Sequence, residues 1–486
     1  MLTQNLSLKQ IEAVNAIDDD VEIIACAGAG KTGVVTRRII NILKCKDDVI
    51  PNNIVAFTFT KKAAEELKSR VYSMGKDVLG DTKGFAEMYI GTIHGFCLKM
   101  LQEYLPEFQT FTVLDDIHTK LFVERYYEEI GMKDMNLQKY TETDLFIKVM
   151  SLLNENWNDS EKWSKNVRDA FEKYQYKMYA EKHFDYSLIL REMVNQLEKN
   201  QTFRKIVAKK VRYLTVDEYQ DTNPVQEKLV SLLKELGANL CVVGDDDQTI
   251  YQFRGSDSTN IITFMQRYNI QKYILLDTDY RSTSGIVDVA RNIIVNNSHR
   301  LPKKMQSGCS TVYDEGDVVF KECNTAEDEY EFIAKNIEKL HKIGVPFSEM
   351  ATLLRKRKVG IDIADVLDEH KIPYIIEGMN ELMHTPECRA AQCIFDYLNG
   401  ECELKELFDK WLSVNYPFDK KELANAFNDL MCLDVSTIKH YPDFNLQKIY
   451  HNFLKKFSLL KMAKRKRKSY YIILESFRKL SMTTKL

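Results

Sequence analysis

The sequence predicts an α/β protein built around a parallel β-sheet, with a phosphate-binding loop directly after the first strand. Short apolar runs alternate with amphipathic stretches early in the chain, as in repeated strand–helix units. The string ACAGAGKT, residues 25–32, joins one such run to one such stretch. A carboxylate pair, Asp217 and Glu218, follows another apolar run further along the chain.

The first two strand–helix units carry the clearest patterns. Residues 21–25, VEIIA, predict a buried strand, and apolar side chains then recur at helical spacing from residue 31. Residues 53–60 predict a second strand. Thr60 is placed to cap the helix that follows, because a threonine hydroxyl can accept a bond from a free N–H of the first turn.

The rest of the chain divides into three further parts. Residues 105–205 are charged and aromatic and predict a helical insertion into a domain formed by residues 1–104 and 206–285. We expect residues 286–400 to form a second, reduced strand-and-helix domain, and residues 401–486 a charged helical segment. Further strands are predicted at residues 211–216, 239–243, 273–276, 318–320, 350–354 and 372–376.

Composition limits the classes of function. The net charge of -3 gives no global attraction to nucleic acid, so any DNA binding must come from local surfaces. No apolar run approaches the roughly 18 residues of a membrane span, and the N-terminus lacks a signal-peptide layout, so we expect a cytoplasmic protein. The ten cysteines show no paired spacing and predict no zinc site.

The loop has the residues that nucleotide binding needs. Gly28 and Gly30 allow backbone N–H groups to converge on phosphate at the start of a helix. Lys31 would neutralise β- and γ-phosphate charge, and the Thr32 hydroxyl would bind Mg²⁺. ATP, or another nucleoside triphosphate, is therefore the expected ligand. The other loop positions, Ala25, Cys26, Ala27 and Ala29, would contribute backbone.

The carboxylate pair supplies the second half of such a site. Asp217 can hold the Mg²⁺ shell, and Glu218 can accept a proton from the attacking water. Either motif alone has a simple alternative, a chance turn with a lysine or a solvated strand end. Their occurrence together, in the expected chain order, favours a P-loop nucleotide site.

Seven strings in order resemble the ATPase half of the UvrD/Rep-like superfamily 1 DNA helicases. They are LSLKQIEAV, ACAGAGKT, AFTFTKKAAEELKSRV, GTIHGFC, VDEYQDTNPVQ, VGDDDQTIYQFRG and LDTDYRST. The family's loop begins with alanine, so Ala25 is expected there. The resemblance implies RecA-like motor domains, the second of them reduced in this chain. Gly33 is a departure, since many relatives carry an arginine directly after the loop threonine.

The resemblance also implies roles for single residues. Gln10 would read the adenine edge, Tyr280 would stack on the base, and Arg281 would contact the γ-phosphate as an arginine finger. Gln248 would be the sensor that couples the γ-phosphate to DNA. The implied single-stranded DNA contacts are Thr58, Phe59, Thr92, His94, Tyr251, Phe253 and Arg254. For Phe59, core packing is the simpler interpretation, and for His94 a structural hydrogen bond.

Two further stretches of the family are not found after residue 400. One ends in KGLE, and the other is ALTRA-like and carries a second arginine finger. A basic run at residues 464–468 could be a solvated helix face or a contact to DNA or a partner. With a reduced C-terminal half, the chain most resembles the GajB family of helicase-like subunits in Gabija antiphage defence systems. That resemblance implies a hetero-oligomer with a GajA-type nuclease that has ATPase and Toprim domains.

Three functions are therefore open. The first is a DNA-stimulated NTPase that binds DNA ends or single strands and assists a partner nuclease in a defence complex. The second is an autonomous repair or replication helicase of the same superfamily. The third is a scaffold subunit that nucleotide switches without turnover.

Overall fold

A computed structural model describes residues 2–155, 163–252, 255–376 and 393. The chain divides into two compact units, residues 1–320 and 321–486. The first unit is built on a parallel sheet of six strands in the order β3-β2-β6-β7-β1-β8. The strands are β1 Val21–Ala25, β2 Ile54–Phe57, β3 Tyr89–Gly91, β6 Tyr213–Val216, β7 Asn239–Gly244 and β8 Tyr273–Leu276.

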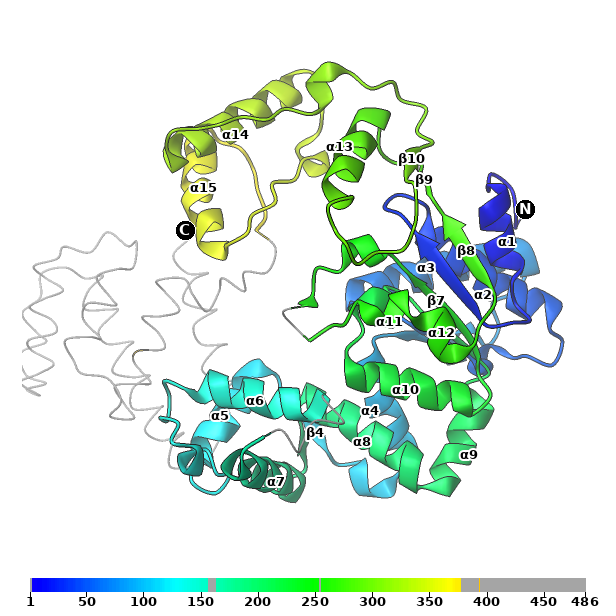
Figure 1. Cartoon of the computed structure of the whole chain (residues 1–486), viewed down its shortest axis with the longest axis vertical. Coiled ribbons are helices and arrows are strands. Elements are labelled where there is room, and N and C mark those ends of the chain that lie inside the picture. The colour runs from blue at the N-terminus through cyan, green and yellow to red at the C-terminus, as the bar shows by residue number, and fades with distance from the viewer. Residues whose placement is uncertain (1, 156–162, 253–254, 377–392, 394–486) are drawn as a thin grey trace, which may run out of the picture. The chain divides into compact units, whose positions relative to one another are not determined.

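Both faces of the sheet are covered by helices, as a parallel sheet requires (Figure 1). Successive residues of a strand point to opposite faces, so Ile23 packs with one cluster of apolar side chains and Ile24 with the other. The Ile23 face is covered by α1 Leu8–Asn15, α2 Lys31–Cys45 and α3 Lys61–Leu79. The Ile24 face is covered by α4 Ile93–Tyr104, α8 Tyr186–Lys199 and α10 Pro224–Glu235.

The region predicted as a helical insertion is helical in the structure. Its helices, besides α8, are α5 Asp116–Arg125, α6 Thr143–Glu155, α7 Lys165–Ala180 and α9 Gln201–Lys210. Helix α8 packs against α4, α6, α9 and α10, so it joins the insertion to the sheet domain. Two short parallel strands, β4 Thr112–Val113 and β5 His183–Phe184, hold the ends of the insertion together.

After β7, the chain of the first unit passes through several short elements. Helices α11 Thr259–Ile262 and α12 Phe264–Tyr268 precede β8, and α13 Ser284–Ile294 follows β9 Thr278–Asp279. β9 pairs in parallel with β10 Gln306–Ser307. This pairing brings the segment around residue 306 back beside the end of the central sheet.

The predicted α/β fold with a parallel P-loop sheet is confirmed, and Thr60 accepts a bond from the Ala63 N–H at the start of α3. The strands predicted at residues 318–320, 350–354 and 372–376 are wrong, because none of these segments is a strand in the structure. Among the described residues they have no neighbouring strand to pair with, and Phe320 and Leu353 are almost fully exposed. An apolar run forms a strand only where a partner offers its backbone.

The described part of the second unit consists of α14 Ala326–Lys342 and α15 Arg357–Glu369, which pack through Tyr330, Ala334 and Leu367. Residues 401–486 and the basic run 464–468 lie outside the described residues, and the domain boundaries drawn from the sequence stay predictions. In the part of the chain that the structure describes, no helix has the length and apolarity needed to cross a membrane.

The core of the insertion gives a first testable prediction. Phe146 and Leu145 are neighbours on α6, but Phe146 is fully buried and Leu145 is 48% exposed. Phe146→Ala leaves a cavity and should lower the free energy of unfolding by about 3–5 kcal/mol. Leu145→Ala should change it by only about 0.5 kcal/mol. Denaturant unfolding of the two variants measures both values, and equal losses would contradict the packing described for α6.

Candidate functional site

The six parallel strands end at one edge of the sheet, and the predicted motifs follow those ends. Cys26 follows β1, Thr58 follows β2, Thr92 follows β3 and Asp217 follows β6, while Asp245 follows β7. In open parallel sheets, ligands bind at this edge. The sheet topology therefore brings together residues that are up to about 220 positions apart in the sequence.

The loop between β1 and α2 has the backbone shape of a phosphate cradle. Gly28 and Gly30 have φ angles of 68° and 78°, which are strained for any residue with a side chain. Gly30 is the N-cap residue of α2, so the free N–H groups of the first turn face the loop. The Gln10 amide donates to the Ala29 carbonyl at 3.1 Å, which places Gln10 against the loop.

The carboxylates lie opposite the loop. The Lys31 ammonium is 3.4 Å from Glu218 Oε2, and the Glu218 N–H donates to Asp217 Oδ1 at 3.0 Å. Burial, with added repulsion from Glu218, raises the pKa of Asp217 to about 7. A bound divalent cation beside Asp217 would favour the charged form of its carboxyl group.

The predicted finger is held against the loop by its backbone. Asp279 Oδ1 accepts bonds from the N–H groups of Arg281 at 2.7 Å and Ser282 at 3.1 Å. The Tyr280 N–H donates to the Gly28 carbonyl at 3.1 Å. The Tyr280 and Arg281 side chains are exposed, so both are available to a ligand beside the loop.

The predicted sensor connects to the carboxylates through a residue that sequence reasoning missed. Gln248 donates to Asp245 Oδ2 at 2.6 Å. Gln220, which is 1% exposed, accepts from the Asp245 N–H at 3.0 Å and donates to Glu218 Oε2 at 2.9 Å. The signal for Gln220 was its place two residues after Glu218, in the 3₁₀ turn Tyr219–Asp221 that ends β6.

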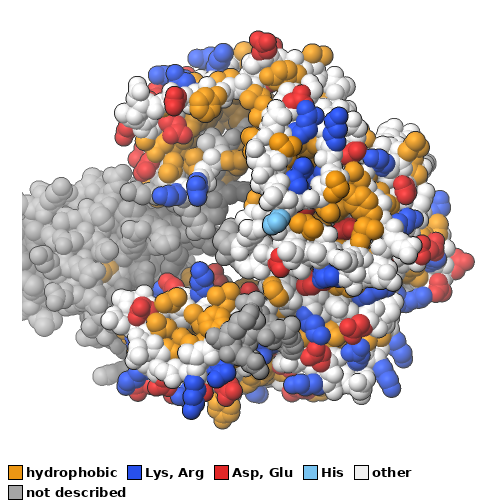
Figure 2. All heavy atoms as spheres, viewed as in Figure 1, with side chains coloured by type: hydrophobic (Ala, Val, Ile, Leu, Met, Phe, Trp, Pro, Cys, Tyr) orange, Lys and Arg blue, Asp and Glu red, His pale blue; other side chains and the backbone are white. Residues whose placement is uncertain are grey.

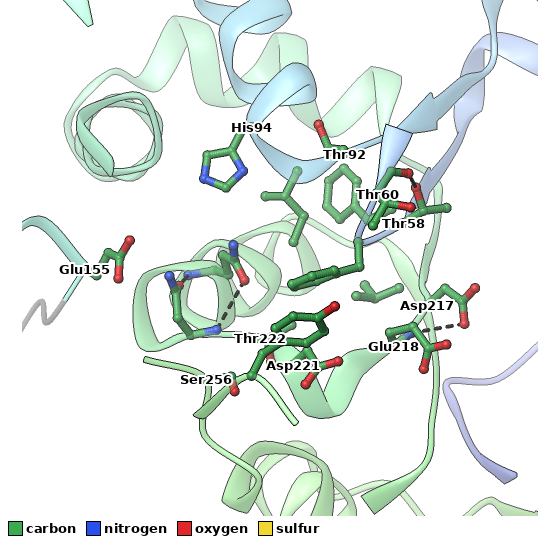
Figure 3. A pocket seen from close by; sticks show the side chains of 17 residues that line it. Thr58, Thr60, Thr92, His94, Glu155, Asp217, Glu218, Asp221, Thr222 and Ser256 are labelled. Atoms are coloured by element: carbon green, nitrogen blue, oxygen red, sulfur yellow. Dashed lines mark hydrogen bonds between the residues drawn. The ribbon is translucent and has the colours of Figure 1, made fainter. Parts of the chain in front are cut away.

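A pocket of about 290 Å³ lies on the other side of the carboxylates (Figure 3). Five of the predicted DNA contacts line it, together with Asp217 and Glu218. These five are Thr58, Phe59, Thr92, His94 and Tyr251. The two remaining candidates, Phe253 and Arg254, lie outside the described residues.

The aromatic side chains of this pocket are arranged for stacking. The rings of Phe59 and Tyr251 are 4.6 Å apart and nearly parallel, at 29°. Phe59 is half-buried rather than part of the core. Burial lowers the pKa of His94 to about 4, so its ring is neutral at pH 7, and it contacts Tyr186 edge-on at 5.7 Å.

The polar lining includes side chains that sequence reasoning did not single out. Asp221 Oδ1 and Ser256 Oγ are buried and have no hydrogen-bond partner among the described residues. Glu155, from the end of α6, also lines the pocket, and burial followed by repulsion from Asp185 raises its pKa to about 7. Buried polar atoms without partners are expected where a ligand completes the bonds. Nothing in the local sequence marks Glu155 or Ser256, because the fold alone brings them here.

Comparison with known proteins agrees with the geometry. A parallel sheet with a P-loop and strand-terminal carboxylates defines the P-loop NTPase class. Residues 6–269 match the UvrD/REP helicase N-terminal domain, and residues 274–408 match the UvrD-like helicase C-terminal domain. The chain belongs to the UvrD/REP helicase family.

Curated relatives are similar over most of this chain. The ATP-dependent DNA helicase PcrA of Staphylococcus epidermidis is 34% identical over 390 residues, and that of Staphylococcus aureus is 33% identical over 390 residues. Each alignment covers 78% of this chain and 51% of the relative. The chain therefore spans about half the length of the curated relatives it matches.

The loop gives the second prediction. A Cβ at Gly28 would lie 1.8 Å from Asp279 Oδ1, whereas a Cβ at Gly80 would meet nothing within 4 Å. Both glycines have similar positive φ angles, 68° and 76°, so alanine costs a similar backbone strain at each. Gly28→Ala should weaken binding of a fluorescent ATP analogue by about tenfold or more, equivalent to about 1.4 kcal/mol. Gly80→Ala should leave the affinity unchanged, and equal affinities of the two variants would argue against a phosphate cradle at Gly28.

Proposed function

We propose that this chain is a DNA-stimulated ATPase of the UvrD-like type. The observation that carries the proposal is that one pair of carboxylates belongs both to the surroundings of the loop and to the aromatic pocket. Asp217 and Glu218 face Lys31 and the loop on one side and line the aromatic pocket on the other. A ligand in the pocket would therefore change the surroundings of the residues that serve the nucleotide.

The residues present fit ATP and Mg²⁺. The cradle is left open by glycines with positive φ, and the donor set of a hydroxyl and a carboxylate is one that Mg²⁺ accepts. We infer that Lys31 binds the phosphates and that Thr32 and Asp217 hold the metal. Bound Mg²⁺ would offset phosphate charge. Glu218 then accepts a proton from water, and Gln220 fixes the orientation of the Glu218 carboxylate through its 2.9 Å bond.

The pocket fits the base of a single strand better than a phosphate. Its described lining contains four carboxyl groups, from Glu155, Asp217, Glu218 and Asp221, and no lysine or arginine. Such a lining repels phosphate, whereas the stacked Phe59 and Tyr251 rings offer an apolar face to a base. DNA phosphates would be bound outside the pocket.

The third prediction tests hydrolysis. Glu218→Gln keeps the shape of the side chain and removes the proton acceptor, so ATP turnover with single-stranded DNA should fall about 10²- to 10⁴-fold. ATP affinity should stay within about twofold or rise, because the Lys31 ammonium loses a competing carboxylate. Phosphate release with and without oligo-dT measures turnover, and filter binding measures affinity. Equal turnover in both proteins would refute the proposal, and binding without turnover in the native chain would favour the nucleotide-switched scaffold.

We further propose that the chain acts as the helicase-like subunit of a Gabija-type antiviral complex with a GajA-type nuclease. Two sequence features support this: the resemblance of the whole chain to that family, and the lack of a KGLE- or ALTRA-like stretch after residue 400. With Arg281 as the finger of the first unit, a partner would complete the cleft. The similarity to PcrA favours a second candidate, an autonomous repair or replication helicase.

The fourth prediction separates these two candidates. Co-expression with a GajA-type nuclease should yield one complex whose mass, measured by light scattering, exceeds that of either chain. The isolated chain should displace less than about a tenth of the strand that the complex displaces, because the proposed partner would supply groups that close over the nucleotide. Robust strand displacement by the isolated chain, with no complex formed, would favour the autonomous helicase.

A further inference from the structure

Three consecutive aspartates after β7 surround a single buried lysine. Lys303 has a side chain that is 1% exposed, and its ammonium bonds to Asp245 Oδ1, to Asp246 Oδ1 at 2.5 Å and to Asp247 Oδ2 at 3.1 Å. The three carboxylates are near enough to one another to hold a metal ion. The ammonium already lies among them, so the cluster is complete without a metal.

The Lys303 ammonium and the carboxylates of Asp245 and Asp246 are all buried. The Asp245 and Asp246 side chains are 3% and 0% exposed. Burial would lower the pKa of Lys303, but Asp245 and Asp246 outweigh it and hold that pKa above its usual value. Removing the ammonium would leave the buried carboxylates of Asp245 and Asp246 without a paired cation among the described residues, because Arg300 forms its hydrogen bonds with Asp247, at 2.7 and 2.9 Å.

Asp245 is the point at which the cluster meets the ATP site. Its Oδ2 accepts from the Gln248 amide, and its N–H donates to Gln220, which in turn donates to Glu218. The ammonium on Oδ1 therefore fixes the carboxylate that holds the predicted sensor. One continuous set of hydrogen bonds runs from Lys303 through Asp245 and Gln220 to Glu218.

The segment that carries Lys303 also holds the predicted finger. Residues 300–308 run from the aspartate cluster to β10, which pairs with β9. The Gly308 N–H donates to the Asp279 carbonyl at 2.7 Å, and the Ser307 hydroxyl donates to the Ser282 carbonyl at 2.7 Å. At its other end, the Leu301 N–H donates to Asp246 Oδ2 at 2.7 Å. The same nine residues thus bond to both sides of Arg281 and to the aspartates beside Gln248.

We propose that Lys303 is a positioning residue that locks the Gln248 sensor and the Arg281 finger into one unit. Its ammonium fixes Asp245 and attaches residues 300–308 to the end of β7. A displacement of the Gln248 sensor would therefore also displace the Arg281 finger, and the reverse. The part of this inference that concerns turnover rests on the proposed ATPase function. The mechanical part does not, because it concerns only the coupling of two segments of the first unit.

The fifth prediction uses Lys303→Met, which keeps the length of the side chain and removes its charge. Lys304→Met is the matched control, because Lys304 is the exposed neighbour. With Mg²⁺ and a non-hydrolysable ATP analogue, amide hydrogen exchange should slow in residues 245–249 and 278–282 of the native chain and of Lys304→Met. In Lys303→Met the two segments should respond separately, and exchange in residues 245–249 should be about tenfold faster. If the analogue slowed amide exchange in both segments of Lys303→Met as much as in the native chain, the proposal would be overturned.

Turnover and rescue distinguish positioning from general stabilisation. Lys303→Met should lower kcat for ATP about tenfold with KM within about twofold, and Lys303→Met with Asp245→Asn should recover part of kcat, because the unpaired charge is gone. Loss of analogue binding together with a lowered melting temperature, without rescue by the double variant, would show a purely structural role and reject the proposal. If the native chain shows no turnover, the ATPase proposal fails while the exchange experiment still decides the role of Lys303.

Discussion

All six strands of the central sheet run in the same direction, and this constraint places the whole candidate site. Because the strands are parallel, their carboxyl ends meet at one edge, and each connection back to the next strand must cross a face of the sheet. The loop, the carboxylates and the aspartate cluster follow β1, β6 and β7, which are neighbours in the strand order. Residues that are far apart in the sequence are therefore close together at this edge.

The same edge concentrates negative charge that the protein must hold without water. Asp217, Asp245 and Asp246 are all buried or half-buried there. Lys303 and Arg300 pair with the three aspartates after β7, and Lys31 lies beside the two acidic residues after β6. Burial is the main cause of the raised pKa of Asp217, and repulsion from Glu218 adds to it. In both groups the acidic residues outnumber the described cations paired with them by one, so negative charge remains at this edge.

Much of the fold could be predicted from the sequence, because local patterns decide it. The strand at residues 21–25 and the cap at Thr60 depend on neighbours within a few positions, and both are present as predicted. The strands at 318–320, 350–354 and 372–376 failed because a strand needs a partner that an apolar run cannot specify. The site divides in the same way. Motif residues such as Lys31 and Glu218 meet as expected, but Gln220, Glu155 and Lys303 gain their significance only from long-range packing.

The backbone conformation of Glu218 explains how one turn can place acidic side chains near Lys31 and also at the aromatic pocket. It has a φ angle of 51°, in the left-handed region that residues with side chains rarely adopt. This turn directs the chain from the end of β6 into the 3₁₀ turn Tyr219–Asp221, so that Glu218 faces Lys31 while Asp221 and Thr222 reach the aromatic pocket. A regular strand end would have sent successive side chains to opposite faces of the sheet. The unusual backbone at Glu218 therefore lets one carboxylate pair lie beside Lys31 and also line the aromatic pocket, and the bond from Gln220 fixes the orientation of the Glu218 carboxylate.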